Sequence, residues 1–142
     1  MSDFVTQRRS FLAGPRFARW GGPSAVLGGG FLGLAARVIV VAVVPATPGD
    51  FPLATLIVNL SGSLLLGLYL ARRERAVAAR WSLQFWAIGA LGSFTTFSTF
   101  SLEVFQLIDV GRAGIAAGYV VASTLGGLAA AVLGSRVGSI GR

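Results

Sequence analysis

Long apolar stretches separated by short polar connections dominate the pattern along this chain. Four such stretches cover about residues 24–44, 53–71, 82–108 and 113–134. A helix needs roughly 20 apolar residues to cross the hydrocarbon core of a bilayer, and each stretch is near or above that length. The stretches do not alternate apolar and polar residues, as the strands of a membrane β-barrel do. The pattern therefore predicts an all-α membrane protein with four transmembrane helices.

The segments between these stretches divide the rest of the chain. Residues 45–52 contain three prolines and a glycine, which cannot continue a helix. Residues 109–112 form an equally short connection between the last two stretches. We therefore expect an Arg-rich N-terminal arm over residues 1–23, a transmembrane domain over 24–134 and a short tail over 135–142.

Composition supports a membrane protein and excludes several other classes. Hydrophobic residues make up 54% of the chain and charged residues 12%, whereas a soluble domain carries about 25% charged residues. The chain has no Cys and no His, which removes disulfides, thiolate metal sites and the commonest general base. It also has no GxxxxGK[ST] phosphate loop and no nucleophile–base pair. We therefore do not expect an enzyme.

The positive charge follows the connections and not a nucleic-acid-binding surface. With four spans, the N-terminus, the second connection and the C-terminus lie on one side of the membrane. That side holds ten of the twelve arginines, and the other side holds only Arg112. Arginine-rich connections stay in the cytoplasm. Both termini are therefore predicted to be cytoplasmic. The ten arginines are residues 8, 9, 16, 19, 72, 73, 75, 80, 136 and 142.

The third stretch contains a segment that is unusual for the middle of a membrane. Residues 89–101 hold two glycines and six hydroxyl side chains, which weaken a helix and offer its backbone other hydrogen bonds. We expect a helix break at residues 92–96. Freed carbonyls of such a break bind cations, and helix N-termini bind anions. Tight packing through small residues is the other interpretation, and the pattern alone does not decide between them.

Other polar residues inside the stretches have the same two interpretations. Asn59 can donate two hydrogen bonds to an anion or serve as an interhelical contact. The hydroxyls of Tyr119 and Ser123 share one helix face and could line a polar track. Arg37 and Glu103 are the charges well inside the spans, and they are functional candidates that could pair with each other. Arg37 could instead reach an interface.

Glycines at helical spacing predict where helices approach closely. Gly29 and Gly33 lie on one face of the first stretch, and Gly114 and Gly118 lie on one face of the fourth. Small residues at this spacing let two backbones come together in a membrane. We expect both pairs to be helix contacts.

Taken together, these segments resemble the Fluc (CrcB-type) fluoride channel family. The resemblance covers residues 29–37, 59–63, 89–100 and 119–123. Its most specific part is Thr95-Thr96-Phe97-Ser98-Thr99-Phe100. It implies a passive fluoride channel in a bacterial plasma (inner) membrane, which would confer resistance to fluoride.

The resemblance also implies an architecture and roles for particular residues. The resemblance implies an antiparallel, dual-topology-type dimer with two narrow pores along its subunit interface. A structural Na⁺ at the dimer centre would be held by the backbone carbonyls of Gly92 and Thr95. The residues matching the fluoride pathway are Asn59, Phe97, Phe100, Ser98, Thr99, Tyr119, Ser123 and Glu103.

Two features depart from the family's pattern. The polar track would continue one turn beyond Ser123, where this chain has Gly127. The arginine bias also favours one orientation, whereas an antiparallel homodimer needs the same chain in both. We therefore hypothesise a heterodimer with an oppositely biased homologue.

Two other functions fit four short spans. A small proton-coupled multidrug exporter needs an acid in the membrane, and here only Glu103 offers one. A scaffold subunit that transports nothing would have no use for the residue 89–101 segment. Fluoride flux through the purified chain distinguishes all three.

Overall fold

The computed structural model describes residues 18–44, 49–73 and 80–140, and this part of the chain contains helices and no strands. The long helices are α2 (Ala18–Val43), α3 (Leu53–Arg73) and α7 (Ala113–Ser139). Helical structure thus begins before residue 24 and continues past residue 134. Most of the predicted N-terminal arm and the last two residues of the tail lie outside the described residues.

The third predicted span is divided into four consecutive pieces. These are α4 (Arg80–Ser82), the π-helix η1 (Leu83–Leu91), α5 (Gly92–Phe94) and α6 (Phe97–Asp109). The other three spans are helices long and apolar enough to cross a membrane, over Gly22–Val43, Leu53–Arg73 and Ala113–Ser139. The described residues therefore contain the predicted four helical segments, with the break in the third.

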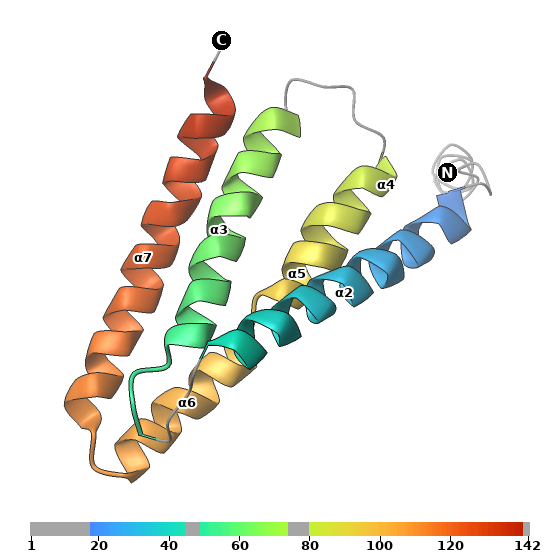
Figure 1. Cartoon of the computed structure of the whole chain (residues 1–142). Helices are drawn as coiled ribbons and strands as arrows, with labels where there is room; N and C mark the ends of the chain where they lie inside the picture. Colours follow the sequence, from blue (N-terminus) through green and yellow to red (C-terminus); the bar gives the residue numbers. More distant parts are fainter. Residues whose placement is uncertain (1–17, 45–48, 74–79, 141–142) are drawn as a thin grey trace, which may run out of the picture.

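The helices pack in two groups that meet near the break. Helix α2 lies along η1 and α5, and α3 lies along α7 (Figure 1). A Cβ atom at Gly29 or Gly33 would clash with the carbonyl oxygen of Phe85 or Ala90, so these glycines permit the α2–η1 contact. The prediction for this pair is confirmed. For Gly114 and Gly118 it is wrong within this chain, because a Cβ at either would meet nothing within 4 Å.

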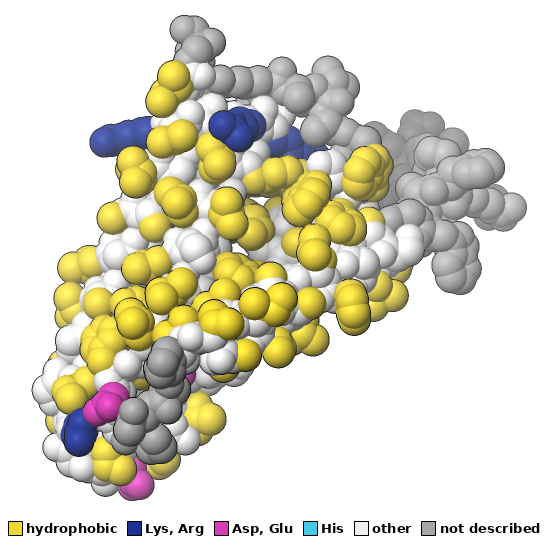
Figure 2. Space-filling model, in the orientation of Figure 1, with side chains coloured by type: hydrophobic (Ala, Val, Ile, Leu, Met, Phe, Trp, Pro, Cys, Tyr) yellow, Lys and Arg dark blue, Asp and Glu magenta, His cyan; other side chains and the backbone are white. Residues whose placement is uncertain are grey.

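The surface of the described chain is strongly apolar. Large hydrophobic side chains such as Leu27 and Phe31 are 74% and 78% exposed, and apolar side chains cover the visible face along all the helices (Figure 2). Water would penalise such a surface heavily, whereas lipid tails are its natural solvent. Charged side chains gather at the two ends (Figure 2). The chain is a multi-pass membrane protein.

Candidate functional site

The centre of the site is a two-residue interruption between α5 and α6. Thr95 (φ −74°, ψ 157°) and Thr96 (φ −147°, ψ 122°) both have extended backbones. Gly92 itself is still helical, with φ −65° and ψ −30°. The break predicted for residues 92–96 is therefore confirmed and confined to its last two residues.

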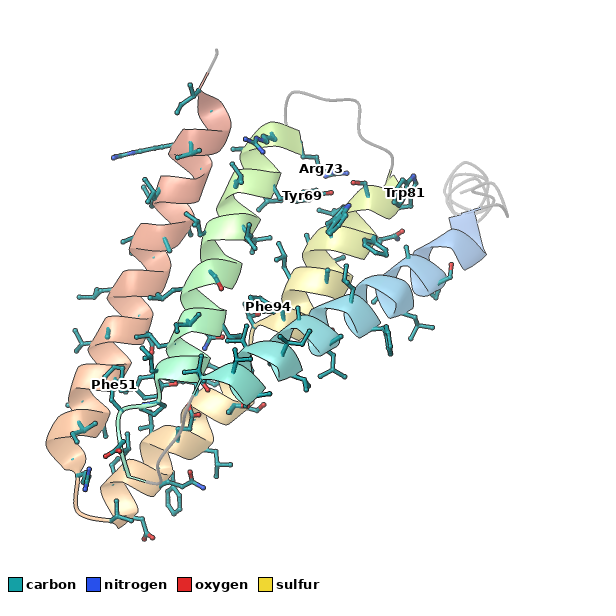
Figure 3. The ribbon with its side chains drawn as sticks, in the orientation of Figure 1. Phe51, Tyr69, Arg73, Trp81 and Phe94 are labelled. Atoms are coloured by element: carbon teal, nitrogen blue, oxygen red, sulfur yellow. The ribbon has the colours of Figure 1, made fainter. Side chains whose placement is uncertain are left out.

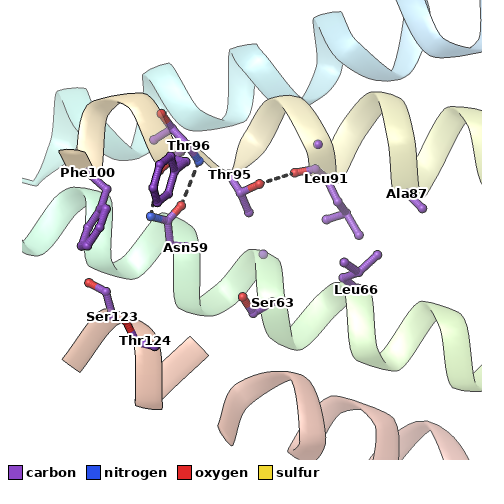
Figure 4. Close-up of a pocket in the computed structure, with 13 residues that line it drawn as sticks. Asn59, Ser63, Leu66, Ala87, Leu91, Thr95, Thr96, Phe100, Ser123 and Thr124 are labelled. Carbon is purple, nitrogen blue, oxygen red and sulfur yellow. Dashed lines mark hydrogen bonds between the residues drawn. The ribbon is translucent and has the colours of Figure 1, made fainter. Parts of the chain in front are cut away.

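The side chain of Asn59 on α3 holds this interruption open. Its Oδ1 accepts the backbone N–H of Thr96 at 2.9 Å (Figure 4), and its Nδ2 donates to the Thr96 carbonyl at 3.0 Å. The carboxamide thus pairs with both polar groups of one residue, as a neighbouring strand would. A primary amide has two N–H donors, so one hydrogen of Nδ2 is left for another acceptor.

This pairing leaves the end of α5 with a free acceptor. In a continuous helix, the Thr96 N–H would donate to the carbonyl of Gly92, but here it donates to Asn59. The amide and the hydroxyl of Thr95 both donate to the Leu91 carbonyl, at 3.1 and 3.0 Å. The Gly92 carbonyl is released, and the Thr95 carbonyl lies on extended backbone.

A new helix N-terminus begins on the other side of the break. The Thr96 hydroxyl accepts the amide of Thr99 at 3.1 Å and so caps α6. It also donates to the Thr99 hydroxyl at 3.0 Å and lies 3.3 Å from that of Ser98. The positive end of the α6 dipole therefore starts at the break.

A cavity of about 400 Å³ opens beside the break; we call it the Asn59 cavity. Its walls come from α3, η1, α5, α6 and α7 (Figure 4). The ring centroids of Phe97 and Phe100 are 5.8 Å apart in its wall, and Phe97 is 80% exposed. The hydroxyl of Ser123 is buried in it without a hydrogen-bond partner among the described residues. The cavity thus offers an amide N–H, a hydroxyl and aromatic edges.

A second cluster lies one helical turn further along α6, around Glu103. Glu103 accepts hydrogen bonds of 2.7 Å from the hydroxyls of Thr55 and Tyr119, one on each carboxylate oxygen. Tyr119 is fully buried, and its ring centroid lies 5.1 Å from that of Phe100. Phe100 therefore connects the Asn59 cavity to this cluster.

Arg37 does not pair with Glu103. Its side chain is half-buried and lines a separate cavity of about 450 Å³ with Thr55, Thr96 and Thr99. The ion pair seen between described residues joins Arg112 and Asp50 at 3.2 Å. It lies at the end of the molecule where α3 begins, opposite to the end where Arg72 lies. The pairing left open by the sequence is thus absent from the described structure.

The structure brings some predicted residues together and separates others. Asn59, Phe97, Phe100, Ser123, Gly92 and Thr95 all line the Asn59 cavity. Thr99 lines the separate cavity beside Arg37, and Ser98 is exposed. Tyr119 and Glu103 form the neighbouring cluster.

Sequence reasoning missed Thr55 and Ser63, which lie one helical turn before and after Asn59. One contacts Glu103 and the other lines the Asn59 cavity. Each lies four residues from Asn59 in the sequence. Residues at i and i+4 share a helix face, so this spacing could have predicted that all three side chains lie on the same side of α3.

Comparison with known proteins identifies close relatives. Residues 24–135 match the family model described as "CrcB-like protein, Camphor Resistance (CrcB)". The chain is 42% identical to "Fluoride-specific ion channel FluC 2" of Geobacillus kaustophilus over 107 residues, which is 74% of this chain and 83% of that protein. It is 38% identical to "Fluoride-specific ion channel FluC" of Nitrobacter winogradskyi over 125 residues, 84% of this chain and 96% of that protein.

Proposed function

This chain belongs to the CrcB-like family, and we infer from that membership that it is a fluoride-specific ion channel subunit. It is not an enzyme: fluoride moves passively down its electrochemical gradient, and an inside-negative potential drives it out of the cell. Export of this kind confers resistance to fluoride. The observation that carries the mechanism is the Asn59–Thr96 pair, which holds a broken helix beside a cavity that offers anion donors.

The Asn59 cavity has the groups that a dehydrated fluoride ion needs. The ion must exchange its water for donors, and the spare Nδ2 hydrogen of Asn59 and the unpartnered hydroxyl of Ser123 supply two. The edges of Phe97 and Phe100 add partial positive charge, since an aromatic ring is electropositive at its rim. These four residues form the proposed core of the pathway.

From this core, the proposed pathway runs past Phe100 toward Glu103. The two hydroxyl donors on Glu103 offset its negative charge, which lowers the repulsion that a passing anion meets. Glu103 also lines a cavity of about 640 Å³ together with Gln106, Asp50 and Arg112 at the far end of the molecule. This cavity gives the pathway a wide exit. Ser98 and Thr99 offer further hydroxyls at the start of α6.

A structural Na⁺ fits the acceptors at the break. The Gly92 carbonyl has lost its helical donor, and the Thr95 carbonyl lies on extended backbone. Oxygen ligands suit a hard cation. Two carbonyls leave such an ion under-coordinated, so a second subunit supplying the same two would complete the site.

The exposed half of the site supports a dimer. Phe97 is 80% exposed although it lines the proposed pathway, and an anion there would face lipid unless another chain covered it. We propose that an antiparallel subunit does so and brings the second Na⁺ carbonyl pair. Because of the arginine bias, that subunit is an oppositely biased homologue in the same plasma membrane, and both termini of this chain are cytoplasmic.

A proton-coupled multidrug exporter is the weaker interpretation, because Glu103 is already held by two hydroxyls. The other acids of the described residues are Asp50, in a connection, and Asp109, the last residue of α6. Fluoride-loaded liposomes distinguish the channel from the exporter. We expect fluoride release to require only valinomycin, which lets K⁺ balance the charge, and to be unchanged when a pH gradient is collapsed with an uncoupler. Release that stops when the proton gradient is removed would refute the channel.

A further inference from the structure

A second cavity, of about 420 Å³, lies between α2, α3 and η1. It shares only Leu91 with the Asn59 cavity. Its walls are mainly apolar and include Leu32, Ala36, Leu65 and Phe94. The volume is in the range of ordinary ligand pockets, and none of the proposed fluoride residues lines it. We call it the α2–α3 groove.

One end of the groove is cationic. Arg72 lines it, and Arg73 follows in the last turn of α3. The Nε atom of Arg73 is buried, yet it has no hydrogen-bond partner in the part of the chain that the structure describes. A buried donor without an acceptor is costly and requires an explanation. Arg73 is not part of the groove wall, so an anionic group that extends past Arg72 at the end of the groove would supply the missing acceptor.

Aromatic side chains place this end of the groove at the membrane surface. Trp86 lines the groove and is 44% exposed, and Trp81, about one helical turn earlier, is 55% exposed. Trp81, Tyr69 and Arg73 lie toward the same end of the molecule (Figure 3). The Tyr69 hydroxyl lies 2.9 Å from that of Ser82. Trp and Tyr concentrate where acyl chains meet headgroups. Arg72 and Arg73 therefore lie at headgroup level, with the apolar groove directed toward the bilayer centre.

We propose that the α2–α3 groove binds one anionic phospholipid. An acyl chain fills the apolar walls, and the phosphate accepts hydrogen bonds from the guanidinium groups of Arg72 and Arg73. Arginine suits this role because its planar fork binds phosphate with two parallel hydrogen bonds. A free phosphate would use only the cationic end, and a helix of a partner subunit would use only the apolar walls. The lipid is the occupant that matches both.

Native mass spectrometry of the purified full-length protein tests this proposal. The protein is delipidated and then exposed to mixed micelles of phosphatidylglycerol and phosphatidylethanolamine. We expect wild type to retain phosphatidylglycerol preferentially, and R72Q/R73Q to retain it at least about tenfold less. The matched control is R136Q, which removes an exposed arginine from the last turn of α7 and should retain as much as wild type. Equal retention by R72Q/R73Q and R136Q would overturn the proposal.

Two further experiments identify what binds in the α2–α3 groove. Ala36→Phe fills the groove without touching charge, so it should reduce phosphatidylglycerol retention while size-exclusion chromatography shows a normal elution profile. Glycerol phosphate, which has the headgroup chemistry but no chain, should not protect wild type against thermal unfolding as the lipid does. Equal protection would mean a plain phosphate site. Absence of lipid from wild type would mean that protein covers the groove, and either result contradicts the proposal.

Discussion

Replacement of Asn59 by leucine is expected to lower fluoride efflux by at least about 30-fold. Leucine has a similar size but removes both hydrogen bonds to Thr96. Each buried group that loses its partner costs about 1–3 kcal/mol, so the open break is destabilised by roughly 2–6 kcal/mol. Since about 1.4 kcal/mol corresponds to a factor of ten, the loss of the open break alone accounts for this reduction. The measurement is the initial rate of electrode-detected efflux from liposomes.

Matched variants on the same helix separate this effect from general damage. Ser61 lies two residues away, and its hydroxyl donates to the Ile57 carbonyl of its own helix at 2.6 Å. Ser61→Ala should therefore leave efflux within about twofold of wild type. Asn59→Asp keeps the acceptor for the Thr96 amide but puts negative charge beside the proposed anion path, so it should be as inactive as leucine. Efflux above half of the wild-type rate in Asn59→Leu would show that the Asn59–Thr96 pair is not needed.

The second large effect concerns orientation. When this chain is expressed alone, a reporter fused to its C-terminus should give a cytoplasmic signal and almost no external one. The described ends of α2, α3 and α7 that carry arginines lie at one end of the molecule, and the opposite end carries Arg112 bonded to Asp50 (Figure 1). Arginines near span ends keep a connection in the cytoplasm. Paired fusions to a cytoplasmic and an external reporter measure both populations.

A charge-reduced variant provides the control for that experiment. Replacing Arg8, Arg9, Arg16 and Arg19 by glutamine removes four of the ten biased arginines and should raise the external signal severalfold. Equal signals from the unchanged chain would refute the heterodimer hypothesis, because such a chain could form the antiparallel pair by itself.

The sequence predicted the transmembrane spans and the helix break, but not the hydrogen-bond partners of the site residues. Length and composition were enough for the spans, and the hydroxyl-rich stretch marked the break to within a few residues. The sequence could not show that Asn59 pairs with Thr96, because the two are 37 residues apart and their contact depends on how α3 packs against the start of α6. The packing of α3 and α7 against α6 also determines that Glu103 accepts hydrogen bonds from Thr55 and Tyr119 and does not pair with Arg37. The π-helix η1 before the break was not predicted from the sequence.

Glycine spacing was an equally incomplete guide. Gly29 and Gly33 contact the η1 backbone, whereas Gly114 and Gly118 have the same spacing and meet nothing within 4 Å. A small-residue pair predicts that a close approach is possible, and only the fold determines which helix uses it.

Fluoride selectivity is measured by comparing fluoride and chloride efflux from the same liposomes. The vesicles contain the purified chain, alone and together with an oppositely biased homologue, and valinomycin starts the release. We expect at least one of these preparations to release fluoride rapidly while chloride stays inside. Release of both anions at similar rates, or no fluoride release from either preparation, would contradict the proposed function.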